Sequence, residues 1–165
     1  MLNICRALPD EYASIGALTV DAYAPVLTFG DADPYRQTLM DAAGRAAAAE
    51  LWSATSGDQL VGTVTVCRPS SRYAEIAALD ELEVRMLAVA PAAQGRGVGV
   101  ALMERIHETA RTEQFAAVVL SVVESNVSAV AFYTALGYTR ARDRDWEPVP
   151  DITLQVWRWP VPQGS

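Results

Sequence analysis

The 165-residue sequence contains no lysine, only two cysteines and a single histidine, and no apolar run reaches 18 residues. The short apolar runs exclude a membrane-spanning helix. Cys5 and Cys67 cannot form a disulfide scaffold, and we expect both to be reduced. Because there is no Cys-x-x-Cys pair and His107 is the sole imidazole, we expect no metal site. The start of the sequence lacks a basic segment followed by an apolar one, so we predict no secretory signal and a cytoplasmic protein.

The charge balance excludes several classes of partner. All 13 basic residues are arginine, and 20 acidic residues leave a net charge of −7. Nucleic acids and anionic membranes bind to basic surfaces, so neither is an expected partner. Hydrophobic residues make up 51% of the sequence, which is too many for a disordered chain. The length predicts a single domain, which we assign to residues 1–160, followed by a frayed end at 161–165.

Hydrophobic periodicity and turn residues predict the elements of the N-terminal half. In chain order, we expect a strand at 2–7, a helix from Pro9 to about Val20, a loop at 24–34, a helix from Tyr35 to about Ala49, and strands at 50–54 and 59–66 joined by a four-residue turn. Tyr23 and Tyr35 stand at the two ends of the loop.

The C-terminal half alternates strands and helices. After a polar connection at 68–80, we expect strands at 82–89 and 117–123, helices at 98–112 and 126–136, a strand starting at Tyr138, a polar loop at 143–150 and a last strand at 152–159. In the strand at 82–89 the even positions are all apolar and the odd positions start polar, which predicts one core face. The order of elements predicts an α/β sandwich with a mixed sheet and not a doubly wound parallel sheet.

The strongest motif is Gln94-Gly-Arg-Gly-Val-Gly99, which lies between a predicted strand and a predicted helix. Its glycines let a ligand approach the main chain closely. The start of the helix adds free N–H groups and the positive end of the helix dipole, so the segment predicts an anion site, most naturally for a phosphate or pyrophosphate. A P-loop is excluded because it needs a lysine, and a Rossmann fingerprint is excluded by the glycine spacing.

The spacing instead matches another family. The segments Leu87-Ala-Val-Ala-Pro91 and Gln94–Gly99 together resemble the acetyl-CoA motif of the GCN5-related N-acetyltransferase (GNAT) family. Asn126-Val-Ser-Ala129, Phe132-Tyr133 and Leu136-Gly137-Tyr138 resemble its C-terminal signature. The resemblance implies a GNAT-type mixed, mostly antiparallel sheet with a splayed central strand pair and helices on both faces. It also implies an acetyl-CoA-dependent N-acetyltransferase in which a primary amine attacks directly in a ternary complex.

The resemblance implies a cofactor site along this motif. The pyrophosphate would lie on the glycine-rich turn and the first turn of the helix. The pantetheine arm would pair like an extra strand with the main chain of residues 87–89, where a main-chain N–H near Leu87 or Val89 would polarise the thioester carbonyl. Asn126 would hydrogen-bond the arm. The implied cofactor residues are Leu87, Ala88, Val89, Gln94, Gly95, Arg96, Gly97, Val98, Gly99, Val100, Asn126 and Tyr133.

The resemblance also implies two catalytic residues. Tyr133 matches the position of a general acid that would protonate the leaving thiolate, although it is also suited to packing beside Phe132. Glu83 matches a general base that would deprotonate the amine directly or through water. The alternative for Glu83 is a solvated carboxylate or an ion pair with Arg85, and Glu81 is a weaker candidate for the base.

In this family the loop at 24–34 and the hairpin at 143–150 would select the acceptor. Near them lie Asp31, Asp33, Asp143, Asp145 and Asp151. They suggest an amine on a polar or cationic body, although aspartate is also a common turn residue. Small-molecule and peptide amines are both compatible with the sequence, as are an acyl group other than acetyl and an O-linked acceptor. The alternative function is a catalytically silent CoA-binding sensor or partner module.

The remaining polar and aromatic residues are interpreted as structural. His107 is expected on a charged helix surface, and Trp146 is expected to cap the sheet more than to line an acceptor site. Trp157 and Trp159 lie in the last strand, whose edge would suit a homodimer contact.

Overall fold

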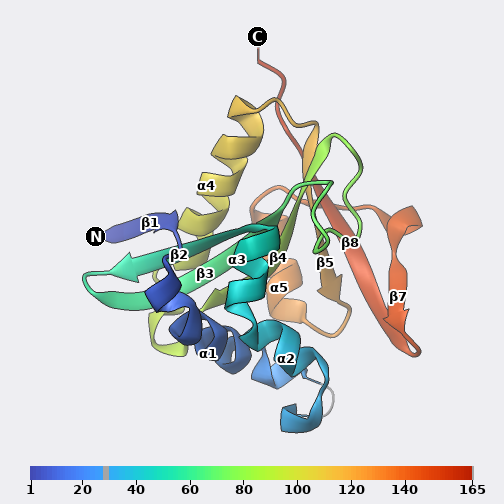
Figure 1. Ribbon diagram of the computed structural model, residues 1–165. Helices are drawn as coiled ribbons and strands as arrows, with labels where there is room; N and C mark the ends of the chain where they lie inside the picture. Colours follow the sequence, from blue (N-terminus) through green and yellow to red (C-terminus); the bar gives the residue numbers. More distant parts are fainter. Residues whose placement is uncertain (28–29, 165) are drawn as a thin grey trace.

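The computed structural model describes residues 1–27 and 30–164. Its strands form one sheet in the order β1-β2-β3-β4-β5-β8-β6, and β7 pairs with β8 (Figure 1). Only β4 and β5 are parallel, and the other described pairs are antiparallel. The strands are β1 Leu2–Arg6, β2 Glu50–Ser56, β3 Gln59–Cys67, β4 Glu81–Val89, β5 Ala117–Val123, β6 Thr139–Arg140, β7 Trp146–Val149 and β8 Ile152–Pro160. The helices are α1 Tyr12–Tyr23, α2 Tyr35–Met40, α3 Ala42–Ala48, α4 Val98–Thr112 and α5 Val127–Ala135.

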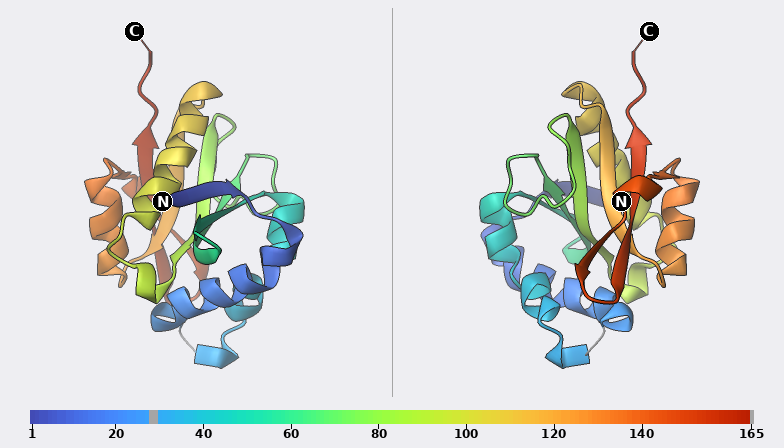
Figure 2. Two further views of the ribbon diagram at one scale, coloured as in Figure 1. Left: turned by 90° about the vertical axis from the view of Figure 1, so that its left-hand side faces the viewer. Right: turned by 90° about the vertical axis from the view of Figure 1, so that its right-hand side faces the viewer.

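Helices cover both faces of the sheet, as the resemblance implied. α1, α2 and α3 lie on one face, while α4 and α5 lie on the other (Figure 2). The main core lies under α4 and α5, where Leu102 and Ile106 pack with Val64, Leu82 and other strand residues. Smaller clusters under α1–α3 complete the opposite layer. The mixed, mostly antiparallel sheet confirms the predicted fold class.

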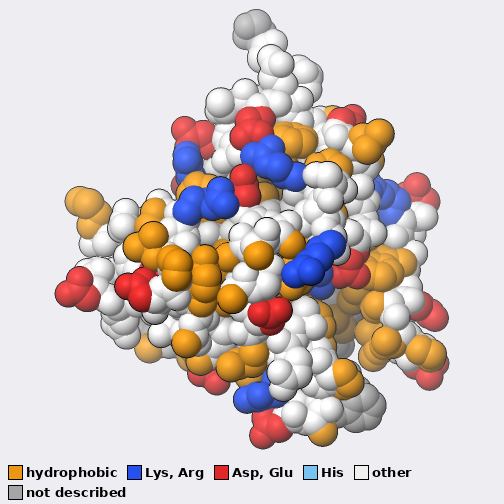
Figure 3. All heavy atoms as spheres, viewed as in Figure 1, with side chains coloured by type: hydrophobic (Ala, Val, Ile, Leu, Met, Phe, Trp, Pro, Cys, Tyr) orange, Lys and Arg blue, Asp and Glu red, His pale blue; other side chains and the backbone are white. Residues whose placement is uncertain are grey.

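The surface agrees with the acidic composition. On the α1–α3 face shown in Figure 3, basic and acidic side chains lie interspersed and do not gather into a basic field. Among residues 1–27 and 30–164, no helix has the length and apolar character needed to cross a membrane.

The predicted helix at 35–49 is divided in two. α2 ends at Met40, and Asp41 adopts a non-helical backbone with φ −79° and ψ 64°. The Asp41 Oδ1 atom accepts a hydrogen bond from the Gly44 N–H at 2.9 Å, which caps α3. A Cβ atom on Gly44 would lie 2.2 Å from the Asp41 carboxylate, so this cap needs the glycine. The run of helix-forming residues on both sides conceals the break from a periodicity argument.

Other boundaries also differ from the predictions. A 3-10 turn at Pro9–Glu11 precedes α1, and α1 then continues beyond Val20 to Tyr23. The hairpin turn is two residues and not four, because β2 extends to Ser56 and β3 starts at Gln59. Gly57 supplies the positive φ of 61° that such a tight turn requires.

A β-bulge interrupts β4. Thr65 pairs with Arg85 and Thr63 pairs with Ala88, so β4 has one residue more than β3 across this interval. Met86 occupies the bulge with a φ of 55°. An extra residue turns the following side chains to the other face of the sheet.

The bulge overturns the prediction of one apolar face along the strand. Leu82 and Val84 belong to the core under α4, whereas Met86 packs with Val20 and Leu39 on the α1 side. After the bulge the odd-numbered residues, including Leu87, face the core under α4.

The predicted splay of the central strands is confirmed. β4 and β5 pair only from Glu81–Ala117 to Val84–Leu120. Beyond that point, β5 remains paired with β8 to its last residue while the remainder of β4 stays with β3. We call the resulting separation between residues 85–89 and 121–123 the β4–β5 gap.

The last strand is interior and not the free edge expected for it. β8 pairs with β5 on one side and with β6 and β7 on the other. Trp157 and Trp159 are therefore buried. The tail predicted to fray at 161 also differs, since Val161 is buried and donates its N–H to the Ala116 carbonyl at 2.9 Å. Ser165 lies outside the described residues.

His107 is buried, contrary to the expectation of a surface position. Only 5% of the residue is exposed. Its ring stacks on Trp159 with the ring centroids 3.9 Å apart, and Nε2 lies 2.9 Å from the Tyr138 hydroxyl. Burial lowers the pKa of His107 to about 4, and the nearby Arg111 adds to the shift. The sequence did carry a signal, because 103, 106, 107 and 110 form the buried stripe of α4.

The buried imidazole predicts an acid-sensitive fold. Since the folded state holds the neutral form and the unfolded chain titrates near 6.5, the unfolded chain binds more protons between those pKa values. The contribution of His107 to the free energy of unfolding is thus fully present above about pH 6.5. On acidification to pH 4, protonation of this group lowers the free energy of unfolding by up to about 3 kcal/mol. Urea unfolding at stepped pH should show a shallower acid slope in His107→Phe, which retains a ring for stacking. An unchanged slope would contradict the assignment.

Candidate functional site

The glycine-rich turn joins β4 to α4. Gly95 and Gly97 have φ values of 77° and 80°, in the left-handed region that favours glycine. Gly97 is the N-cap residue of α4. The N–H groups of the first α4 residues, 98–100, donate no hydrogen bond to the described residues, and the first helical bond runs from the Ala101 N–H to the Gly97 carbonyl. Exposed donors at a helix start are suited to an anion, as the sequence motif predicts.

Gly99 has a different role from the other two glycines. Its φ is not positive, and a Cβ atom there would lie 3.2 Å from Cζ of Phe132 on α5. This glycine therefore allows α5 to approach α4 closely. The sequence motif alone did not separate this packing role from the conformational role of Gly95 and Gly97.

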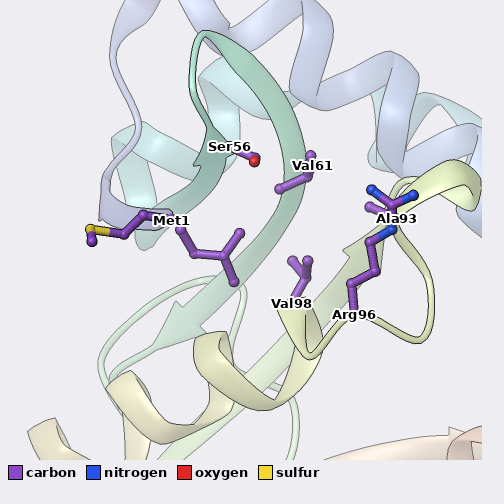
Figure 4. A pocket seen from close by; sticks show the side chains of 7 residues that line it. Met1, Ser56, Val61, Ala93, Arg96 and Val98 are labelled. Carbon is purple, nitrogen blue, oxygen red and sulfur yellow. The ribbon is translucent and has the colours of Figure 1, made fainter.

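Arg96 lies beside a separate pocket. The pocket has a volume of about 190 Å³ and lies between the turn and the hairpin of β2 and β3, where Figure 4 shows its walls. It is lined by Met1, Leu2, Ser56, Val61, Ala93, Arg96 and Val98. Because residues 85–89 and 121–123 do not line it, this pocket is distinct from the β4–β5 gap.

The β4 segment predicted to hold the pantetheine arm borders the gap. Residues 87–89 follow the last pair between β4 and β5, so no described strand pairs with this side of their main chain. The other side is held by β3, through the pair of Gly62 with Val89 and the hydrogen bond from the Ala90 N–H to the Val61 carbonyl at 2.8 Å. An added extended chain could pair with the main-chain groups on this side.

Asn126 lies between β5 and α5. Its Oδ1 atom accepts a hydrogen bond from the Ala129 N–H at 3.2 Å and caps α5. Its side-chain amide nitrogen has no hydrogen-bond partner within residues 1–27 and 30–164. This N–H₂ group is the part of Asn126 left for a ligand.

Tyr133 is positioned by aromatic packing and has an unpartnered hydroxyl. The residue is 8% exposed, and its ring meets Phe132 and Tyr138 edge-on, with centroid distances of 5.1 and 5.5 Å. Its hydroxyl forms no hydrogen bond with the part of the chain that the structure describes. Burial raises the pKa of the Tyr133 phenol, which keeps it protonated at neutral pH.

Tyr23 is a second phenol, at the end of α1 on the opposite face of the sheet. Burial raises the pKa of its phenol, and the neighbouring phenols of Tyr35 and Tyr133 raise it further. The phenols of Tyr23 and Tyr133 thus influence each other electrostatically although α1 and α5 cover different faces. The sequence places Tyr23 only at the end of a loop, and its separation from Tyr133 along the chain gives no sign of this coupling.

Glu83 is buried, with 2% exposure, on the α1 face of β4. Its Oε1 atom accepts hydrogen bonds from the backbone N–H groups of Glu75, Ile76 and Ala77 at 2.8, 2.8 and 3.0 Å. This position corrects the alternative of a solvated carboxylate or an ion pair with Arg85. Burial raises the pKa of Glu83, while the three backbone hydrogen bonds oppose the rise. The Oε2 atom has no partner in the described chain.

The neighbouring charged residues of β4 also have partners within the protein. Glu81 is 3% exposed and forms ion pairs with Arg144 at 2.9 Å and Arg158 at 3.1 Å, which occupy its carboxylate. Arg85 forms an ion pair with Glu75 at 2.6 Å. Glu81, Glu83 and Arg85 all hold the connection between β3 and β4 against the sheet through hydrogen bonds or this ion pair.

Three of the five aspartates near the acidic loops have partners within the described residues, whereas Asp143 and Asp151 are exposed and form no ion pair or side-chain hydrogen bond there. Asp31 lies 3.7 Å from Arg36, and Asp33 accepts the Tyr35 N–H at 3.0 Å. Asp145 pairs with Arg140 and accepts the N–H of residue 156. Positions 28–29 of the predicted acceptor loop lie outside the described residues.

Trp146 covers the sheet beside the gap. Its indole N–H donates to the Ser121 hydroxyl at 3.2 Å. Ser121 is the first β5 residue beyond the pairing with β4, so the indole lies at the start of the gap. No group of three or more metal-ligating side chains occurs among residues 1–27 and 30–164.

Comparisons with known proteins agree with this geometry. The family model described as Acetyltransferase (GNAT) family matches residues 16–138. An acetyltransferase of the GNAT family from Staphylococcus aureus Mu50 superposes with a TM-score of 0.75 and 14% identity, covering 98% of this chain and 100% of that one. The structure of yncA from Salmonella typhimurium with its cofactor acetyl-CoA gives a TM-score of 0.70 and 15% identity, covering 100% and 96% of the chains.

A curated protein also matches in sequence. N-acetyltransferase 8B of Rattus norvegicus is 31% identical over 93 residues. The match spans 54% of this chain and 39% of that protein, so well under half of the relative is represented here.

Proposed function

The chain belongs to the acetyltransferase (GNAT) family, and from this premise we propose that it transfers the acetyl group of acetyl-CoA to an amine. The observation that carries the proposal is the presence of three features that suit an acetyl-CoA site. These are the free N–H groups at the start of α4, the unpaired main chain of residues 87–89 and the unpartnered hydroxyl of Tyr133.

The residues present fit coenzyme A along the gap. Residues 95–100 would hold the pyrophosphate through main-chain N–H groups, since Gly95 and Gly97 leave open space above the turn. The main chain of residues 87–89 would hydrogen-bond the pantetheine arm, and the Asn126 amide nitrogen would add a donor. Acetyl-CoA supplies an activated acetyl thioester.

The chain's own residues can move the required protons. Glu83 Oε2 would accept the proton of the acceptor amine, directly or through a water molecule, while Oε1 stays bound to the loop. A main-chain N–H near Leu87 or Val89 would stabilise negative charge on the thioester oxygen. The Tyr133 hydroxyl would donate its proton to the departing sulfur.

The test is thiol release from acetyl-CoA, measured with a panel of small amines and peptides with free N-termini. We expect amine-dependent release, with the acetylated product identified by mass. Coenzyme A binding with no release for any amine would instead support the silent sensor or partner module.

Substituting Gly97 separates the anion site from general stability. In Gly97→Ala the alanine would have to adopt a φ of 80°, which strains an L residue. Its methyl group would occupy the open space beside the main chain where we propose that the pyrophosphate binds. We expect KM for acetyl-CoA to rise about tenfold, which corresponds to about 1.4 kcal/mol of lost binding. Gly57→Ala is the matched control, because its φ is 61° with open space around it, but it lies in the hairpin turn. Equal KM changes in the two variants would contradict this placement.

A further inference from the structure

The charges on the acceptor side of the gap are not those that the loop composition suggested. Asp31, Asp33 and Asp145 are occupied by Arg36, Arg140 and backbone N–H groups, which leaves only the exposed Asp143 and Asp151 of the five loop aspartates. The side chains that β4 directs toward α1 beside the bulge include Arg85. The identity of the acceptor is therefore better argued from this arginine and its surroundings.

Arg85 is half-buried and held in place. Its side chain is 16% exposed and precedes the bulge residue by one position. It donates to the Tyr73 carbonyl and to the Tyr35 hydroxyl, both at 3.2 Å, and forms an ion pair with Glu75 at 2.6 Å. The Glu75 side chain is more exposed, at 32%, and its second oxygen has no partner in the described chain.

A second arginine, Arg45, lies near Arg85. Arg45 on α3 is fully buried, and none of the described carboxylates lies within ion-pair distance of it. It donates to the Thr65 hydroxyl at 3.0 Å and the Leu39 carbonyl at 2.7 Å, while its Nε atom has no hydrogen-bond partner in the described chain. Thr65 is the sheet partner of Arg85, which brings the two guanidinium groups into one region. A buried cation without a carboxylate favours an anion nearby.

The position of Arg85 suits an anion carried by the acceptor. Glu83, the proposed base, is two residues earlier on the same face of β4, about 7 Å along the strand. An amine between Glu83 and the gap would therefore have Arg85 within the reach of a carboxylate a few atoms away. Arginine binds carboxylates in a bidentate geometry, and the Tyr35 hydroxyl lies beside it as a second polar contact.

Building on the proposed acetyl transfer, we propose that the acceptor is an amine that carries a carboxylate close to its nitrogen, as a free amino acid does, and that Arg85 binds this carboxylate. Glu75 pairs with the guanidinium until the acceptor carboxylate takes its place, and Arg45 contributes positive potential from the α3 side of the sheet. This assignment replaces the cationic acceptor suggested by the acidic loops.

The experiment compares each free amino acid of a standard panel with its amide, which has the same side chain but no carboxylate. Thiol release by the unmodified protein should favour the free acids. In Arg85→Met, KM for the best free acid should rise about tenfold, while kcat/KM for its amide stays within about twofold. Comparing variants on one substrate removes the difference in basicity between the two amines.

Two further variants keep the result interpretable if Arg85→Met folds poorly. Glu75→Gln retains Arg85 and removes its competitor, so KM for the free acid should fall while the amide is unaffected. Arg72→Met is the control, because this arginine is exposed on the same loop and stacks on Tyr73. Equal activity with acids and amides, or equal loss with both in Arg85→Met, would overturn the inference alone. If no amine of the panel caused thiol release, both the proposed function and this inference would be refuted.

Discussion

Replacing Tyr133 with phenylalanine should lower kcat by about a hundredfold. The expectation follows from the position of the hydroxyl, which has no hydrogen-bond partner in the described chain and is therefore available to the departing sulfur. The raised pKa of the phenol keeps its proton in place throughout the neutral range, so the group acts as a donor. The measurement is steady-state thiol release at saturating amine.

The structure predicts that this substitution leaves the fold intact. Phenylalanine retains the ring that packs edge-on against Phe132 and Tyr138, so the melting temperature and KM for acetyl-CoA should change little. Tyr12→Phe on α1 is a control that removes a phenol away from the gap. A loss of kcat smaller than threefold would show that the thiolate leaves without help from Tyr133.

Replacing Glu83 with glutamine should lower kcat/KM by about thirtyfold to a hundredfold at neutral pH. Glutamine retains a carbonyl oxygen that can accept the N–H groups of residues 75–77, so the loop should stay in place. Only the ionised carboxylate can take a proton, and burial raises its pKa. Activity should therefore fall as the pH drops through a value above that of an ordinary glutamate, and this acid limb should vanish in Glu83→Gln.

Glu81→Gln is the matched control for this prediction. Glu81 lies on the same face of the same strand and also binds the connection between β3 and β4, but its carboxylate is occupied by Arg144 and Arg158. Its substitution should lower the free energy of unfolding and leave the acid limb unchanged. If both variants lost the limb, the effect would come from the loop and not from a base at Glu83.

The order of elements and the glycine-rich turn before α4 could be predicted from the sequence because both depend on local patterns. Strand and helix periodicity gave the α/β class, and the glycine spacing at 95–99 located the start of α4. The splay of β4 from β5 came from the family resemblance, since nothing within a single strand indicates where its pairing with another ends.

The missed features depend on tertiary contacts or on one inserted residue. Met86 is an ordinary strand residue in sequence, yet its positive φ reverses the faces of the residues that follow. His107 lies among charged neighbours in sequence, and although it falls on the buried stripe of α4, its ring is covered by Trp159 from the distant β8. The environment of Glu83 depends on residues 75–77, which lie in a connection whose path cannot be predicted from hydrophobic periodicity. The errors at His107 and Glu83 arose where distant segments determine the environment of a side chain.

The bulge in β4 has a consequence for how such a protein can diversify. In the proposed site, the strand before Met86 would offer side chains to the acceptor, and the strand after it would offer mainly backbone to the acetyl donor. Substitutions at positions such as 85 can therefore alter acceptor choice while the donor continues to meet unchanged peptide groups. One inserted residue thus makes the two specificities separable, so that a new acceptor can be acquired by selection, or by engineering, without rebuilding the cofactor site.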